Sequence, residues 1–169
     1  MGVTSEIAIE PSLKAEFAAY SVAGHKLMQV RPSEAPAAIV AAVDAFVDKH
    51  QANSRTFFGK LLGSRKNNTE TALALGIVWG DQLVRELGWE WTSVMKDASL
   101  YYVISSPDRS LVVYATYFIK ECLDFHTADC TAMLAFNMLR EGAFSKQQAG
   151  SYTSVMPAVF RLVPKSAVK

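Results

Sequence analysis

One segment of the chain, residues 69–95, changes its hydrophobic periodicity in the middle, and this change limits the folds that can contain it. Up to Leu87 the apolar residues recur at the spacing of a helix with one buried face. From Trp89 onward apolar and polar residues alternate, as they do in a strand with one buried face. A helix that passes directly into a strand through Gly88 predicts an α+β fold.

Helices are expected before the strands. The pattern predicts one helix over residues 11–24 that stops at Gly24, a second that Ser33 caps and that frays near His50, and a third over Thr69–Leu87. In the third helix Ala72, Gly76 and Gly80 fall four residues apart. A glycine inside a helix costs about 1 kcal/mol relative to alanine. We therefore expect these residues to form a flat ridge that another element approaches closely.

Three strands are expected after Gly88, at Glu90–Lys96, Leu100–Ser105 and Ser110–Ala115. The links between them hold turn-type residues at the length of a hairpin. Helical patterns return over residues 116–123 and 127–141, the second with Thr127 as its cap. The sequence predicts an antiparallel meander of three or more strands packed against several helices.

The length of the chain predicts one domain over residues 1–169. We expect a core over about residues 33–142, with residues 143–169 as a C-terminal extension packed on this core or trailing from it. Trp79, Trp89 and Trp91 are expected to pack in the core, although one of them could be exposed at the edge of the sheet.

Charge and terminal composition exclude several classes of function. Seventeen basic and sixteen acidic residues give a net charge of +1, whereas a dedicated nucleic-acid binder normally has a clear basic excess. The first residues lack the features of a secretory signal, and the longest apolar run is too short to span a membrane. We expect a cytoplasmic protein without a membrane span, a nucleic-acid partner or a cofactor.

Cys122, His126 and Cys130 lie four residues apart, which on one continuous helix would align three possible zinc ligands. The residues between the cysteines instead predict a joint between two helices, which destroys that alignment. We therefore expect no metal site. A thiol-dependent enzyme that uses Cys122 or Cys130 remains the catalytic alternative, but no motif supplies an activating group, so the sequence predicts a protein that is not an enzyme.

One segment interleaves basic and large apolar residues and is the predicted partner-binding cluster. Its members are Arg55, Phe57, Phe58, Lys60, Arg65 and Lys66. Exposed arginine and aromatic side chains are typical anchors of protein–protein interfaces. The alternative is a buried turn that places Phe57 and Leu61 under the core, with the charged side chains in solvent.

The run GIVWGDQLVRELGWEW and the later SLVVYATYFIKECLD resemble a bacterial α+β domain family of unknown function. The shared features are a helix with the Trp79–Gly80 pair and a Gly-Trp-x-Trp exit, here from Gly88 to Trp91, and the resemblance covers roughly residues 35–140. Where such families often have a proline before the second-half helix, this chain has Ala115. The resemblance implies a fold and no chemistry.

By analogy in size and type, such domains are similar to the immunity proteins that neutralise bacterial toxins. This analogy predicts a protein that binds a cognate toxin and blocks it. The alternatives are a regulator that binds a small ligand and a structural protein that assembles with itself, and a homodimer is possible in either case.

Overall fold

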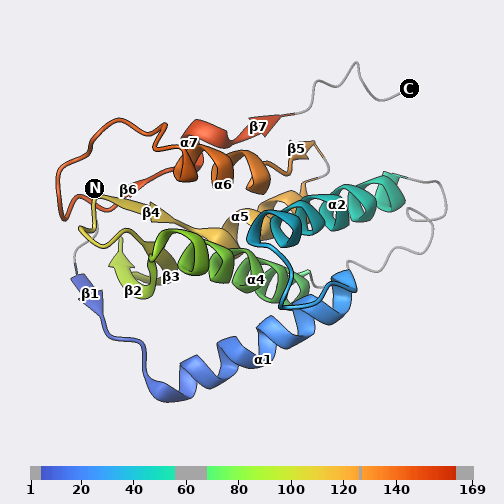
Figure 1. Cartoon of the computed structure of the whole chain (residues 1–169), viewed down its shortest axis with the longest axis horizontal. Coiled ribbons are helices and arrows are strands. Elements are labelled where there is room, and N and C mark those ends of the chain that lie inside the picture. The colour runs from blue at the N-terminus through green and yellow to red at the C-terminus, as the bar shows by residue number, and fades with distance from the viewer. Residues whose placement is uncertain (1–4, 56–67, 126, 163–169) are drawn as a thin grey trace.

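Helix α4, residues Thr69–Leu87, lies at the centre of the fold and has the bounds that its sequence pattern predicts. It packs against α1, α2, α5 and the sheet (Figure 1). Gly88 ends the helix with a φ of 66°, a left-handed conformation that glycine adopts without strain, and its N–H donates to the carbonyl oxygen of Val84. The chain then enters strand β2 at Glu90.

The computed structural model describes residues 5–55, 68–125 and 127–162. The helices in these ranges, besides α4, are α1 (Pro11–Met28), α2 (Pro36–Arg55), α5 (Ala115–Asp124), α6 (Ala132–Arg140) and α7 (Met156–Val159). The strands are β1 (Ser5–Ile7), β2 (Glu90–Lys96), β3 (Ser99–Ser105), β4 (Leu111–Val113), β5 (Ala128–Asp129), β6 (Thr153–Ser154) and β7 (Arg161–Leu162). The chain is an α+β single domain, which confirms the predicted fold class.

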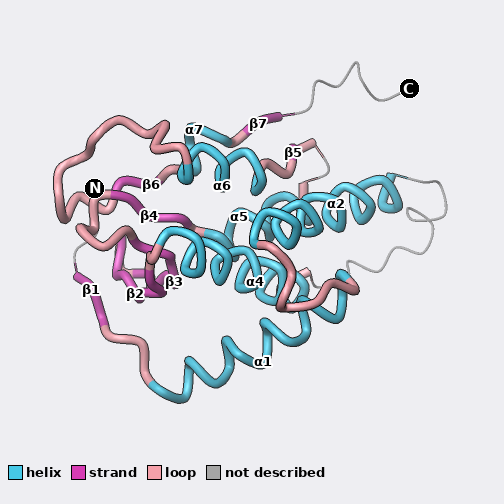
Figure 2. The backbone as a smooth tube through the Cα atoms, viewed as in Figure 1, coloured by secondary structure: helices cyan, strands magenta, loops and turns pink. Residues whose placement is uncertain are grey.

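Five strands form one sheet in the order β1-β2-β3-β4-β6, and they gather at one end of the helical part (Figure 2). β2, β3 and β4 form the predicted antiparallel meander, with Trp91 opposite Ile104 and Ile104 opposite Val113. β1 adds an antiparallel strand at one edge, and β6 adds a parallel strand at the other. β4 is shorter than predicted because α5 begins at Ala115.

The sheet is strongly curled. The edge strands of a flat five-stranded sheet would lie about 19 Å apart, at about 4.8 Å per strand pair. Here Tyr152, just before β6, donates its hydroxyl hydrogen to Oε2 of Glu6 in β1, with 2.5 Å between the oxygen atoms. Tyr152 also packs on the small cluster of Val94, Val103 and Val112, separate from the main core. Side chains from both edges therefore close over one face of the sheet.

The glycine ridge of α4 is confirmed. A Cβ atom added to Gly76 would lie 2.5 Å from the Cα atom of Thr116, in the first turn of α5. A Cβ atom added to Gly80 would lie 2.2 Å from Cζ2 of Trp91. The two glycines thus let α5 and the sheet approach the α4 backbone, and this close packing offsets their low helix propensity.

Two predicted helix ends were wrong. Gly24 does not stop α1, which continues to Met28 and ends at Gln29 with a φ of 58°. Gly24 is buried instead, because a Cβ atom at this position would lie 2.5 Å from the carbonyl oxygen of Ala74 in α4. The predicted helix over residues 127–141 begins at Ala132, since Ala128 and Asp129 form β5 by pairing with β7.

The main core lies between α4 and its neighbouring helices and strands. Trp79 is fully buried in it, and Trp89 and Trp91 pack against it half-buried. Val155 and Val159, beyond residue 142, belong to the same cluster. The C-terminal segment therefore contributes both β6 and buried side chains to the domain.

The β2–β3 hairpin carries a local strain that the sequence did not reveal. Its central residues, Asp97 and Ala98, have φ values of 49° and 61°, as a type I′ turn requires. Replacing Ala98 with glycine should raise the free energy of unfolding by about 1 kcal/mol, because the left-handed conformation costs an alanine about that much. The control is Ala19→Gly, at an exposed position inside α1, which should lower the free energy of unfolding by about the same amount. Urea unfolding of both variants tests this, and an Ala98→Gly variant no more stable than the parent would contradict it.

Candidate functional site

The predicted partner-binding cluster lies almost entirely outside the described residues. Arg55 is the last residue of α2, and nothing is described of its side chain. Phe57, Phe58, Lys60, Arg65 and Lys66 fall within residues 56–67. Their role stays a prediction from the sequence.

A tyrosine-lined groove of about 190 Å³ lies where α4, α5 and β3 meet. We call it the tyrosine groove, and it is lined by Thr69, Ala72, Leu73, Leu100, Tyr101, Tyr102, Tyr114, Thr116, Tyr117 and Lys120. Leu100 is 45% exposed and Tyr117 is 56% exposed. Large side chains that border a hollow and remain in water are candidate contacts for another molecule.

The position of α5 follows from contacts at both of its ends. Thr116 near its start lies against Gly76, and the carbonyl of Leu123 near its end accepts a hydrogen bond from Nδ2 of Asn68, just before α4. The two helices therefore run antiparallel. Nε2 of the buried Gln51 donates to the carbonyl oxygens of Cys122, at 2.6 Å, and Ala128, at 2.7 Å. The carbonyl groups of Cys122 and Leu123 are among those that the end of a helix leaves without partners, and these amides satisfy them.

Two tyrosines of the groove, Tyr114 and Tyr117, hold their hydroxyl protons at neutral pH. Tyr101 and Tyr114 meet edge to face, with ring centroids 5.5 Å apart. Burial raises the pKa of Tyr114, and the charge of Glu121 raises that of Tyr117. Lys120, at the rim, forms an ion pair with Asp124. The groove thus offers apolar walls, phenol groups that can donate or accept hydrogen bonds, and one ammonium group.

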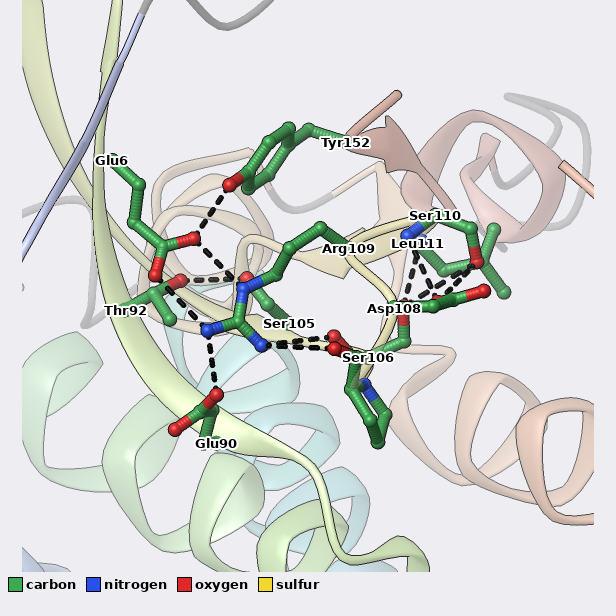
Figure 3. A network of polar contacts seen from close by, with 11 residues as sticks. Glu6, Glu90, Thr92, Ser105, Ser106, Asp108, Arg109, Ser110, Leu111 and Tyr152 are labelled. Atoms are coloured by element: carbon green, nitrogen blue, oxygen red, sulfur yellow. Dashed lines mark hydrogen bonds and ion pairs between the residues drawn. The ribbon is translucent and has the colours of Figure 1, made fainter. Parts of the chain in front are cut away.

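A polar network on the curled face of the sheet joins Glu6 in β1 to Arg109, in the turn before β4, and to Tyr152, just before β6 (Figure 3). Arg109 donates to both carboxylate oxygens of Glu6, at 2.8 and 3.0 Å, and forms an ion pair with Glu90 at 2.6 Å. The hydrogen bond from Arg109 lowers the pKa of Glu6. Since each charged group of the network is paired with an opposite charge, we infer that the network stabilises the fold and is not a binding site.

Asp108 shapes the turn from which Arg109 projects (Figure 3). Its Oδ1 atom accepts hydrogen bonds from the backbone N–H of Ser110 and from the hydroxyl groups of Ser106 and Ser110. These bonds, with the backbone bond the largest cause, lower the pKa of Asp108 to about 2. The Asp108 carboxylate therefore stabilises its own turn through these hydrogen bonds.

The two cysteines lie on either side of a joint, as the sequence predicted. Cys122 belongs to α5, Cys130 follows β5, and His126 lies outside the described residues. In the described ranges no group of three or more His, Cys, Asp or Glu side chains is placed to hold a metal ion. The interaction with Cys122, together with burial, raises the pKa of the Cys130 thiol well above its usual value.

A second hollow of about 400 Å³ lies between the end of α1 and α2. Leu27, Met28, Phe46, Lys49 and His50 are among its lining residues. It is larger than the tyrosine groove and less aromatic.

No family model, curated protein or solved structure matches this chain. Among the described residues, no helix has both the length and the apolar composition needed to cross a bilayer.

Sequence reasoning missed the tyrosine groove. A signal was present on α5, where Phe118, Ile119 and Cys122 form the buried stripe and Tyr117 is an aromatic residue outside it. The other walls come from the start of α4 and from β3, which are far from Tyr117 in the sequence. No spacing rule brings such segments together.

Proposed function

We propose that this chain is a non-enzymatic binding protein that uses the tyrosine groove to hold a protein partner. The observation that carries the proposal is the combination of exposed Tyr117 and Leu100 with a hollow bordered by further tyrosines. Tyrosine is enriched among the residues that dominate binding energy at protein interfaces, since it buries a large apolar area and still offers a hydroxyl group.

The size of the groove favours a protein side chain over a free metabolite. Pockets for small ligands usually measure about 300–1,000 Å³, whereas this groove measures about 190 Å³. We expect the partner to insert one apolar or aromatic side chain between Leu100 and Tyr117. A carboxylate beside that side chain would meet Lys120, which the free protein pairs with Asp124.

The partner that we propose is a cognate bacterial toxin acting in the cytoplasm. Support comes from the analogy in size and type with immunity proteins and from the charge of the chain. A toxin with a basic nucleic-acid-binding cleft would call for a strongly acidic inhibitor, and this chain has a net charge of +1. The proposed mode of action is occlusion of the toxin by direct contact.

The test co-expresses the chain with the product of the neighbouring gene, in a bacterial host whose growth that product arrests. We expect the chain to restore growth and to bind the purified product. Tyr117→Ala should weaken binding by roughly 30-fold, as the loss of an anchor worth about 2 kcal/mol does, and should abolish rescue. Phe125→Ala is the matched control, because Phe125 ends the same helix, is 57% exposed and does not line the groove.

Two results would contradict the proposal. Unchanged binding by Tyr117→Ala with a loss in the double variant Arg65→Glu, Lys66→Glu would move the contact to the cluster predicted from the sequence. If the product of the neighbouring gene neither arrests growth nor binds the chain, the proposal that the partner is a toxin is wrong.

The hollow between α1 and α2 supports a second candidate function, a regulator that binds a small ligand. Its volume of about 400 Å³ falls within the usual range of ligand pockets. A ligand at this place should raise the melting temperature in a concentration-dependent way, and Phe46→Ala should remove that increase.

A further inference from the structure

The two cysteines of the chain meet inside the fold, although seven residues separate them in the sequence. Cys122 lies near the end of α5, and Cys130 lies between β5 and α6. The turn between these elements folds back, because the N–H of Ala128 donates to the carbonyl of Phe125. Sγ of Cys122 lies 3.7 Å from the carbonyl oxygen of Asp129, the residue that precedes Cys130, so the two cysteines are neighbours in the fold. Neither is in a disulfide.

Each thiol has a different acceptor. Sγ of Cys130 donates to Oδ1 of Asp44 over 3.1 Å, whereas Sγ of Cys122 lies 3.7 Å from the backbone carbonyl oxygen of Asp129. A carboxylate can take up a proton, and an amide carbonyl cannot do so under ordinary conditions. Asp44 can therefore accept the proton of the Cys130 thiol when the sulfur reacts.

The carboxylate of Asp44 is held firmly in this position. Its two oxygen atoms accept the backbone N–H groups of Ala132 and Met133, the first residues of α6, each at 3.1 Å. These bonds fix the orientation of the carboxylate toward Cys130. The two thiols also differ in access, since Cys130 is 7% exposed and Cys122 is fully buried. A small oxidant would reach Cys130 first.

We propose that Cys122 and Cys130 are a redox pair that a hydroperoxide converts into an intramolecular disulfide, with Cys130 as the attacking thiol and Asp44 as its proton acceptor. In the first step the sulfur of Cys130 attacks one oxygen of the hydroperoxide. The O–O bond breaks, a sulfenic acid forms, and the proton held by Asp44 completes the leaving water or alcohol.

In the second step the sulfur of Cys122 attacks the sulfenic sulfur. An S–S bond forms and water leaves. With hydrogen peroxide, the two thiols lose two electrons and two protons, and the peroxide becomes two molecules of water. Because Cys122 and Cys130 are neighbours in the fold, we expect disulfide formation to be faster than further oxidation of the sulfenic acid.

The raised pKa of Cys130 makes the first step slow, because the thiolate is the nucleophile. The new bond would tie the end of α5 to the start of α6 and would remove the S–H donor from Asp44. Since α5 carries Tyr117 and Lys120, the bond would also rigidify one wall of the tyrosine groove.

The experiment treats the folded full chain with hydrogen peroxide and follows its mass and its peptide map. We expect the loss of two hydrogen atoms and a peptide that links Cys122 to Cys130, reversed by dithiothreitol. In Cys122→Ser, dimedone should label a sulfenic acid at Cys130, and in Cys130→Ser it should leave Cys122 unlabelled. Sulfinic acid as the main product, or first labelling at Cys122, would overturn the proposal.

Asp44→Asn tests the proton acceptor. This variant keeps one of the two oxygen atoms that accept the α6 N–H groups and places an NH2 group at the other. We expect it to slow disulfide formation at least tenfold at pH 7, although it also removes a charge that helps to raise the pKa of Cys130. The groups that face Asp44 and titrate are Cys130 and Asp48. The rate in Asp44→Asn should therefore rise more steeply between pH 7 and 8 than in the parent.

Asp129→Asn is the control, because it leaves the carbonyl beside Cys122 in place. A rate in Asp44→Asn that equals or exceeds the rate of the parent would overturn the role of Asp44 as proton acceptor. Should circular dichroism show that Asp44→Asn is unfolded, the labelling of the two cysteine variants still decides the order of attack.

Discussion

Replacing Gly76 with alanine is expected to lower the free energy of unfolding by about 2–4 kcal/mol. Inside a helix this exchange normally stabilises by about 1 kcal/mol, so the expected effect has the opposite sign. The new Cβ atom would lie 2.5 Å from Cα and 2.8 Å from the backbone nitrogen of Thr116. Backbone atoms at the start of α5 cannot rotate away as a side chain can, so α5 must shift, at the cost typical of overpacking.

Gly88→Ala is the matched control, because a Cβ atom there would meet nothing within 4 Å. Its free energy of unfolding should fall by about 1 kcal/mol, because alanine is strained in the left-handed backbone conformation of this position. Gly80→Leu should also lose a few kcal/mol, since its side chain would enter the space of the Trp91 ring. Chemical unfolding measures all three, and a Gly76→Ala variant as stable as the parent would show that α4 and α5 do not need this close approach.

The second expected result concerns the pH dependence of stability. Burial raises the pKa of Asp44 from 3.8 to about 6, although three hydrogen-bond donors oppose the shift. A raised pKa in the folded state means that protonation favours folding. The contribution of Asp44 to the free energy of unfolding is therefore fully present below about pH 3.8 and is lost as the pH rises through about 6. Its total size is about 3 kcal/mol, of which about 1 kcal/mol falls between pH 7 and pH 5.

The measurement compares the parent with Asp44→Asn, whose side chain does not titrate. The stability of the parent relative to the variant should increase by about 1 kcal/mol from pH 7 to pH 5. Taking the difference between the two proteins cancels the contributions of the other carboxylates with shifted pKa values. These include Asp81, whose pKa is raised by burial, and Asp108, whose pKa is lowered by hydrogen bonds. Parallel pH curves for the two proteins would contradict the raised pKa.

Sequence patterns that depend on near neighbours were reliable in this protein. The bounds of α4 and β2 follow from hydrophobic periodicity, which local burial imposes on every helix and strand with one exposed face. The meander follows from turn residues at hairpin length. The glycine ridge also followed from local energetics, because unfavourable residues inside a helix need a compensation that packing provides.

The errors arose where a distant segment changed the meaning of a local signal. Gly24 has the composition of a helix stop, but its role is to make room for Ala74. Thr127 precedes a helical pattern, but β7 draws the next residues into a strand pair. The start of α6 is held by Asp44, a carboxylate from another helix, in the place where a local cap was expected.

The candidate site depended still more on the tertiary structure. Asp44 stands beside the apolar stripe of α2, which marks it as unusual, but its contact with Cys130 spans 86 residues. The tyrosine groove collects side chains from α4, β3 and α5. The sequence alone determined the fold class, the central helix and the meander, because these follow from periodicity and turns. Only the tertiary structure decided which tyrosines border one hollow and which thiol meets a carboxylate, because such contacts depend on how whole elements pack.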